Sequence, residues 1–309
     1  SQIATINHMY NVNAELKQML NELTSQFSAK DMLNALRGKD NLMFTSFGDL
    51  ENVAVETPKE INDGPFAENI EKSSPKNLDG MEEITSAKAE ELARQYFASY
   101  EISDAKCTGE VAAQQLGLYN VCMTTREGEM TAQISKQGGK VVEFNSYKEC
   151  TDNNFSVERC IDIAEDFLNN LGFTDMKPVW TSENGTTCNL NFAYEQDGVV
   201  LYPDMVKIKV CEQRGIVTGM EALAYVLNHT DRDIPDAKIT KSDAAENIMQ
   251  GFETEGSRLC IIPVDGEEVL CYEFYGNYSG CDYYIYIDAN TGNEVQIFTV
   301  IGTKQGKAL

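Results

Sequence analysis

One short α+β unit occurs three times along this chain, and that repetition constrains the fold more than any single motif. Each copy opens with an amphipathic helical stretch, continues through β-like segments and ends on a strand–turn–strand. The helical openings are residues 84–97, 155–167 and 239–248, and the closing turns are residues 134–142, 208–217 and 287–295. A repeated small unit favours a modular binding scaffold over an enzyme built around one cleft.

The fold class that we expect is α+β, with three tandem modules in which a helix packs on a small antiparallel sheet, preceded by a helical segment. Apolar residues at alternating three- and four-residue spacing predict that helical segment near the N-terminus. Prolines and glycines that break regular elements predict a linker or an ordered strap after it. The expected boundaries are 1–55 for the helical end of a larger N-terminal region, 56–83 for the linker or strap, and 84–150, 151–232 and 233–309 for the three repeats.

The start of each repeat carries a residue suited to cap a helix. Thr85 or Ser86, Ser156 and Thr240 precede the three amphipathic stretches, and their hydroxyls can accept a hydrogen bond from the first helical turn. Period-two alternation of apolar residues predicts the strands that follow. Residues 222–227 are compatible with either a strand or a short helix.

The charge of the chain restricts its partners. The 309 residues carry a formal net charge of −24, which repels nucleic acid and anionic lipid and favours a basic partner surface. The same charge is also compatible with a role in solubility alone. We find no apolar run of the length that crosses a bilayer and no pattern of a signal peptide.

The nine cysteines do not form a metal-binding or redox motif. None are at C-x-x-C spacing, and an odd number cannot all pair within one chain. We therefore expect reduced cysteines that behave as small apolar residues in strands. Two pairs are expected to face each other on neighbouring strands, namely Cys107 with Cys122 and Cys260 with Cys271.

No residue stands out as catalytic, cofactor-binding or metal-ligating. His8 and His229 are isolated, and a lone histidine seldom acts without a positioned partner. Residues 288–292 (DANTG) are predicted to form a hairpin turn, because the downstream glutamate of a calcium loop is missing. The acid pairs that could imitate a glycosidase are interpreted as solvated residues on a helix and in a loop: Asp162 with Asp166, and Glu267 with Glu268.

Aromatic residues gather in the last repeat. Tyrosine is enriched at interfaces because it offers a large amphipathic contact area, although it is also a common residue of strands. Trp180, the only tryptophan, is predicted to lie in the core. The tyrosines concerned are Tyr272, Tyr275, Tyr278, Tyr283, Tyr284 and Tyr286.

The helix–strands–turn unit that closes on residues 287–295 (IDANTGNEV) resembles the PepSY domain. A more specific similarity involves residues 63–70 (DGPFAENI), 78–80 (LDG) and 84–89 (ITSAKA). These residues resemble the junction of YpeB-type spore germination proteins of endospore-forming Firmicutes, where such a segment leads into the first PepSY-like repeat. The similarity extends from about residue 40 to the C-terminus.

The resemblance implies a non-catalytic germination protein that binds, holds, stabilises or restrains a SleB-type cortex-lytic enzyme in the dormant spore. It implies a place at the inner spore membrane or on its cortex side, with an anchor N-terminal to these residues. We expect no cofactor, no nucleic acid, no small-molecule substrate, and membrane contact through that anchor alone. Three alternatives remain: a PepSY-type protease inhibitor, a peptidoglycan-acting enzyme with paired carboxylates, and a structural coat or cortex component.

Overall fold

The structure is a computed structural model that describes residues 59–61, 64–66, 76–126, 128–146, 149–300 and 305–307. The chain forms two compact units, Ser1–Glu60 and Ile61–Leu309. Strand β1 (Lys59–Ile61) spans the boundary between them, and the other elements belong to the second unit. The predicted N-terminal helical segment, with His8, lies outside the described residues.

The first repeat contains one α-helix and a four-stranded antiparallel meander. Thr85 caps the helix by accepting a hydrogen bond from the Lys88 backbone amide. Ala89, Ala93 and Phe97 on its inner side are fully buried. The elements are η1 (Lys76–Leu78), α4 (Ser86–Tyr96), η2 (Ala98–Tyr100), β2 (Ile102–Ala113), β3 (Leu116–Thr125), β4 (Gly128–Ser135) and β5 (Val141–Ser146).

The second repeat has the same order of elements, followed by an additional short helix. Ser156 caps α5 through the Arg159 amide. The segment 222–227, for which the sequence left strand and helix open, belongs to helix α6. The elements are α5 (Val157–Asn170), β6 (Met176–Asn184), β7 (Thr187–Gln196), β8 (Val199–Cys211), β9 (Ile216–Glu221) and α6 (Leu223–Asn228).

The third repeat keeps the four strands but has a shorter helix than its sequence predicts. Thr240 and Asp243 form a reciprocal capping box, and α7 ends after five residues. The elements are α7 (Lys241–Ala245), β10 (Glu253–Val264), β11 (Glu267–Tyr278), β12 (Cys281–Asp288) and β13 (Glu294–Val300), and β14 (Gln305–Lys307) follows.

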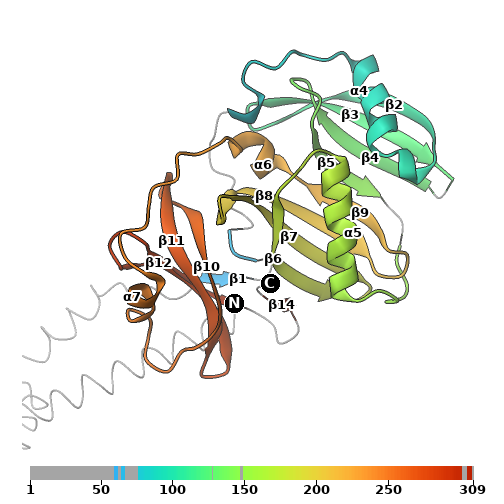
Figure 1. Cartoon of the computed structure of the whole chain (residues 1–309). Coiled ribbons are helices and arrows are strands. Elements are labelled where there is room, and N and C mark those ends of the chain that lie inside the picture. The colour runs from blue at the N-terminus through green and yellow to red at the C-terminus, as the bar shows by residue number, and fades with distance from the viewer. Residues whose placement is uncertain are drawn as a thin grey trace, which may run out of the picture. The chain divides into compact units, whose positions relative to one another are not determined.

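The sheets are joined into one larger sheet and are not separate small sheets (Figure 1). The strand order is β13-β12-β11-β10-β8-β9-β5-β4-β3-β2, and β7, β6 and β14 branch from β8. Repeats one and two meet through the antiparallel pair β5–β9. Repeats two and three meet through a short parallel pair in which Cys260 lies opposite Val200 and Ile261 opposite Leu201. The fold is therefore more sheet-rich than the sequence analysis expects.

Helices α4 and α5 pack on the same face of the joined sheet and share one apolar core. Phe97 from the α4 end stacks on Phe144 of β5 with ring centroids 4.6 Å apart, and Phe167 of α5 lies 5.9 Å from Phe144. Aromatic contacts of this kind add to the free energy gained from burial. The first two repeats therefore share one core.

The opposite face of repeat two packs on repeat three, and the 64–66 segment completes that core. The ring of Phe66 lies 5.0 to 5.1 Å from the rings of Tyr202, Tyr286 and Phe298. Gly64 has φ +95°, and a Cβ there would lie 2.7 Å from the Trp180 ring. Glycine is required at this position by both the conformation and the close approach, which gives a physical reason for the Gly-Pro-Phe sequence.

We predict that Phe66→Ala lowers the free energy of unfolding by about 3 kcal/mol, because it removes a buried ring from between three others. Urea unfolding followed by tyrosine and tryptophan fluorescence measures this change. Val111→Ala is the matched control, since Val111 is 43% exposed and its loss should cost less than about 0.5 kcal/mol. Equal midpoints for the two variants would contradict the role assigned to Phe66.

Candidate functional site between the first two repeats

A groove of about 830 Å³ lies where repeats one and two join. We call it the inter-repeat groove. Its lining comes from residues 99–101 after α4, residues 125, 126 and 128–130 at the β3–β4 hairpin, Ser146, the outer face of α5 and residues 214–217 after β8. Two basic residues, Arg126 and Arg214, and three acidic residues, Glu101, Glu129 and Asp166, contribute to this lining.

The described pairing of β5 with β4 ends beside the groove, where Ser146 lies opposite Met130. In β4, Met130 is the first residue with a β5 partner, and Gly128 and Glu129 extend beyond it. In β9, Gly219 is the first residue with a β5 partner, and Ile216 and Val217 extend beyond it. The starts of β4 and β9 thus line the groove, and backbone at the start of a strand can pair with an extended segment of another chain.

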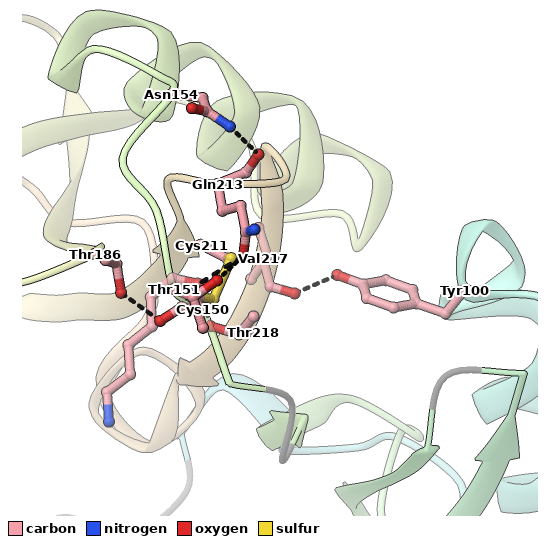
Figure 2. Close-up of a disulfide and its surroundings, with 10 residues drawn as sticks. Tyr100, Cys150, Thr151, Asn154, Thr186, Cys211, Gln213, Val217 and Thr218 are labelled. Atoms are coloured by element: carbon pink, nitrogen blue, oxygen red, sulfur yellow. Dashed lines mark hydrogen bonds between the residues drawn. A yellow bond between two sulfur atoms is a disulfide. The ribbon is translucent and has the colours of Figure 1, made fainter.

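The floor of the groove is apolar and fixed in place. Tyr100 donates a hydrogen bond from its hydroxyl to the Val217 carbonyl oxygen at 2.7 Å, across the repeat boundary (Figure 2). Burial raises the pKa of Tyr100, so the hydroxyl remains a donor at neutral pH. The centroid of the Tyr100 ring lies 5.6 Å from that of Phe144. The centroid of the Phe167 ring lies 5.9 Å from that of Phe144. Tyr100 and Phe167 therefore give the groove an aromatic floor.

A disulfide bonds the wall of the groove to the segment between the repeats. Cys150 and Cys211 are cross-linked with their Cα atoms 5.8 Å apart and 61 residues of sequence separation (Figure 2). The expectation that the cysteines are reduced is wrong for this pair. Nothing in the spacing of the two residues indicated it, because the pairing depends on the edge at which β8 ends.

Hydrogen bonds hold the same segment on the β8–β9 turn (Figure 2). The backbone amide and hydroxyl of Thr151 both donate to Gln213 Oε1 at 3.1 Å. Asn154 Nδ2 donates to the Gln213 carbonyl oxygen at 3.2 Å, and Thr186 Oγ1 donates to the Cys150 carbonyl oxygen at 2.7 Å. The turn continues directly into residues 214–217, so these bonds position one wall of the groove.

A glycine permits the close approach in this turn. Gly215 has φ +61°, and a Cβ there would lie 2.9 to 3.1 Å from the Phe155 ring. The amides of Asn154 and Phe155 also donate to the Glu212 carbonyl oxygen, each at 3.0 Å. The glycine thus lets the inter-repeat segment lie flat against the turn.

The remaining described cysteines are free thiols. Cys260 lies directly opposite Cys271 in the β10–β11 ladder, which confirms that expected pairing of positions. Cys107 lies opposite Val121, and Cys122 lies opposite Lys106, so the other expected pair is out of register. A bulge between Cys107 and Gly109 follows in β2. The free cysteines are Cys107, Cys122, Cys160, Cys188, Cys260, Cys271 and Cys281.

His229 and Glu268 both belong to an ionic cluster between repeats two and three that is centred on the buried Asp204. The Asp204 side chain is fully buried, and its Oδ1 and Oδ2 lie 2.7 and 2.8 Å from the guanidinium of Arg232. His229 Nδ1 lies 2.8 Å from Asp204 Oδ2, and its ring stacks on Tyr225 at 4.2 Å. Arg232 also donates to both oxygens of Glu268 at 2.9 Å. These residues attach the inter-repeat segment to β8 and β11.

The proposed acid pairs do not face each other across a cleft. Asp162 forms an exposed ion pair with Arg159 one turn earlier on α5, at 3.2 Å, while Asp166 lines the inter-repeat groove. Glu267 and Glu268 begin strand β11 and do not lie in a loop as expected. Glu268 is occupied by Arg232. The pairs therefore occupy different elements, without the opposed arrangement that glycoside hydrolysis requires.

Residues 288–292 form the predicted turn. Asp288 Oδ1 accepts hydrogen bonds from the amides of Asn290 and Thr291 at 2.6 and 3.1 Å, so this carboxylate stabilises the hairpin between β12 and β13. Among the described residues, no group of three or more histidine, cysteine, aspartate or glutamate side chains has the arrangement of a metal site. No described helix is long and apolar enough to cross a membrane.

The tyrosines of the last repeat serve an interface inside the molecule. Tyr275, Tyr284 and Tyr286 are buried in the core between repeats two and three, while Tyr278 is 37% exposed. Trp180 is 1% exposed, which confirms its predicted place in the core. Its ring lies 5.9 Å from that of Tyr284. Much of the aromatic enrichment therefore reflects contact between repeats.

We predict that Cys150→Ser lowers the free energy of unfolding by about 2–4 kcal/mol, because it opens a loop of 61 residues. Denaturation with and without dithiothreitol tests this: the reductant should destabilise the unmodified chain and leave Cys150→Ser unchanged. Cys107→Ser, at a free and half-exposed cysteine, is the control and should behave like the unmodified chain. A reductant-insensitive unmodified chain would contradict the cross-link.

We also predict that Arg232→Met costs about 3–5 kcal/mol, because it leaves the carboxylate of Asp204 buried without its cation. Arg159→Met, which breaks the exposed pair with Asp162, should cost about 0–1 kcal/mol. Thermal and urea unfolding of the two variants compares these costs. Similar values for both would mean that Arg232 is not the counter-ion on which the cluster depends.

Comparison with known proteins assigns the chain to a family. The model of the family described as YpeB sporulation, PepSY1 and PepSY2 domains, matches residues 43–235. A sporulation protein YpeB of Halalkalibacterium halodurans is 28% identical over 282 residues, which cover 89% of this chain and 61% of the relative. The sporulation protein YpeB of Oceanobacillus iheyensis is 32% identical over 232 residues, covering 73% of this chain and 51% of the relative.

A solved structure agrees with this assignment. The YpeB C-terminal domain of Bacillus megaterium superposes with a TM-score of 0.63 at 27% identity, covering 72% of this chain and all of that chain. The chain thus spans between half and two thirds of the length of the two curated relatives described above. Because the family model covers well over half of its residues, the chain belongs to the YpeB family of sporulation proteins.

Proposed function

We propose that this chain is the part of a non-catalytic germination protein that binds, holds and restrains a SleB-type cortex-lytic enzyme in the dormant spore. Family membership supports a role in sporulation. The observation that carries the binding role is the inter-repeat groove, which the starts of β4 and β9 line. We further propose a position at the inner spore membrane or on its cortex side.

The groove has the features of a site for an extended protein segment. Gly128 and Glu129 of β4 and residues 216 and 217 of β9 line it with backbone in strand geometry, and the carbonyl oxygen of Val217 is bonded to Tyr100. Main-chain pairing of this kind gives affinity, and neighbouring side-chain pockets give specificity. Ile163 and Phe167 provide apolar contact. A partner segment in the groove would therefore lie beside backbone that is already in strand conformation.

The electrostatics favour a partner with basic character. The net charge of −24 attracts a basic surface over a range set by ionic strength. Within the groove, Asp166, Glu101 and Glu129 exceed Arg126 and Arg214 by one negative charge. Complementary charge of this kind speeds association and selects among partners more than it adds affinity.

A non-catalytic role agrees with how the titratable groups are used. His229 is held between Asp204 and two tyrosine rings. Glu268 is engaged by Arg232, and Asp288 stabilises a turn. Each of these groups has a structural partner that fixes it, whereas a general acid or base needs access to a substrate proton.

We also propose that residues 233–309 form a third PepSY-like module after the two that the family model covers. Its order of one helix and four strands repeats that of the first two units. The capped helix start and the closing Asp288 turn are in corresponding positions.

The proposal is tested by calorimetry of this chain with a purified SleB-type cortex-lytic enzyme at two salt concentrations. We expect saturable binding that weakens as salt rises, because opposite charges contribute to it. Asp166→Lys should weaken binding at least tenfold. Asp162→Lys, one turn earlier on the same helix and outside the groove, should bind like the unmodified chain.

Two results would count against the proposal. No saturable heat up to about 100 μM enzyme would exclude an affinity useful for holding it. If Asp166→Lys and Asp162→Lys weakened binding equally, the attraction would be a general electrostatic one and the groove would not be the docking site.

A further inference from the structure

Two free thiols lie together in the core that the first two repeats share. Cys160 belongs to α5 and Cys188 to β7, and neither side chain has any exposed surface. Both are members of the same apolar cluster, and their side chains share a hydrogen bond. We call them the α5–β7 thiol pair.

The sequence places each thiol on the surface that faces the other. Cys160, Ala164 and Leu168 form the buried stripe of α5, at the spacing of one helix face. Cys188, Leu190 and Phe192 are buried alternate residues of β7, and alternate residues point to the same side of a strand. All six belong to one cluster, so the two thiols meet across the contact between helix and sheet.

The starts of α5 and β7 also lie beside the same turn. Thr187, the first residue of β7, lies opposite Cys211 at the end of β8. The carbonyl oxygen of Glu212 accepts hydrogen bonds from the backbone amides of residues 154 and 155, which directly precede α5 and its cap. The β8–β9 turn, which the disulfide of the groove wall holds in place, therefore brings the two element starts together.

The two thiols are unequal in acidity. Their mutual hydrogen bond lowers the pKa of Cys160 and raises that of Cys188, and burial raises the pKa of Cys188 further. The carboxylates of Glu183 and Glu212 oppose ionisation of both thiols. Cys160 is close to the capped N-terminus of α5, where the partial positive charge of a helix stabilises a thiolate. Cys160 is thus the sulfur that ionises first.

We propose that the α5–β7 thiol pair is a site of reversible oxidation, at which a low-molecular-weight disulfide converts the two thiols into a cross-link between α5 and β7. The Cys160 thiolate attacks one sulfur of the small disulfide, and the first small thiol leaves. The Cys188 sulfur then attacks Cys160 Sγ of the mixed disulfide, and the second small thiol leaves. The protein loses two electrons and two protons, and the small disulfide gains them as two thiols.

The other facing pair of free thiols lacks this arrangement. Cys260 and Cys271 lie opposite each other in the β10–β11 ladder, but Cys260 Sγ donates to the Cys271 carbonyl oxygen at 3.5 Å. A cross-link there would join two strands that are already paired along their length. The α5–β7 pair instead joins a helix to a strand, and no backbone ladder holds these two elements together.

The cross-link would act on one wall of the inter-repeat groove. The groove side of α5 carries Ile163, Asp166 and Phe167, while Cys160 is on the buried side of the same helix. A covalent bond from that side to β7 would hold the helix on the sheet. The oxidation state of the pair would therefore set how firmly this wall is held. The inference concerns chemistry within the chain and does not depend on the cortex-lytic partner.

Trypsin digestion isolates the α5–β7 thiol pair for the test. Cleavage after Arg159 and Lys207 releases residues 160–207, because Lys177 is followed by Pro178, and Cys160 and Cys188 are the only cysteines in this peptide. The chain is equilibrated with glutathione and glutathione disulfide, from the reduced and the oxidised side, and then alkylated with iodoacetamide in urea. Mass spectrometry finds two alkyl groups on the peptide with free thiols and none on the cross-linked peptide.

We expect both alkyl groups to disappear in oxidising buffer and to return after dithiothreitol. The cross-link should form at a glutathione to glutathione disulfide ratio at least tenfold more reducing in the folded chain than in the chain unfolded by urea, because native packing holds the sulfurs together. Two alkyl groups or glutathione adducts at every ratio would overturn the proposal. The same midpoint in the folded and unfolded chain would also overturn it.

A matched pair of variants assigns the reaction to these two sulfurs. In Cys188→Ala the peptide should keep one alkyl group or take up one glutathione. Cys122→Ala, at a half-buried free cysteine of β3, should leave the cross-link and its midpoint unchanged. Loss of alkylation without glutathione uptake in Cys188→Ala would mean that Cys160 has another partner, and this would exclude the pair.

Discussion

Strand β8 is the element on which the rest of the structure depends, because it carries three neighbours along its 13 residues. Strand β7 pairs along most of one side, and β9 and β10 occupy different parts of the other side. A shorter β8 could not pair with both β9 and β10 on that side. Since a small repeat with one helix has a thin core of its own, this sharing lets each repeat complete its hydrophobic burial against the next.

The contacts that secure this arrangement are few and chemically distinct. Phe66 fills the aromatic core between repeats two and three, and the Asp204–Arg232 pair attaches the segment that connects them. The Cys150–Cys211 disulfide attaches the segment that connects repeats one and two. Both inter-repeat segments are therefore tied to β8, one near its middle and one at its end. Because β8 is attached to one connecting segment at Asp204 and to the other at Cys211, the three repeats keep fixed positions along this strand.

The sequence predicts the local structure well and the long-range structure poorly. The caps Thr85, Ser156 and Thr240 and the turn at Asp288 depend on residues within a few positions of one another, and the structure confirms them. The Cys150–Cys211 bond joins residues 61 positions apart, and the parallel pairing of β8 with β10 depends on how two whole repeats meet. Neither leaves a periodic signal in the sequence. For the same reason the inter-repeat groove has no sequence signal, since a residue such as Asp166 has no local feature that separates it from other surface charges.

Both cavities lie at junctions between repeats, which links the fold to what it can bind. The inter-repeat groove lies beside the starts of β4 and β9, and a second cavity of about 470 Å³ lies beside the part of β10 that pairs with β11 alone among the described strands. Each opening lies at a junction, so its walls come from two repeats. A ligand in either place would therefore sense the relative position of two modules. Repeats that diverge in surface residues while keeping their strands can thus change what is bound at a junction without changing how the junction is built.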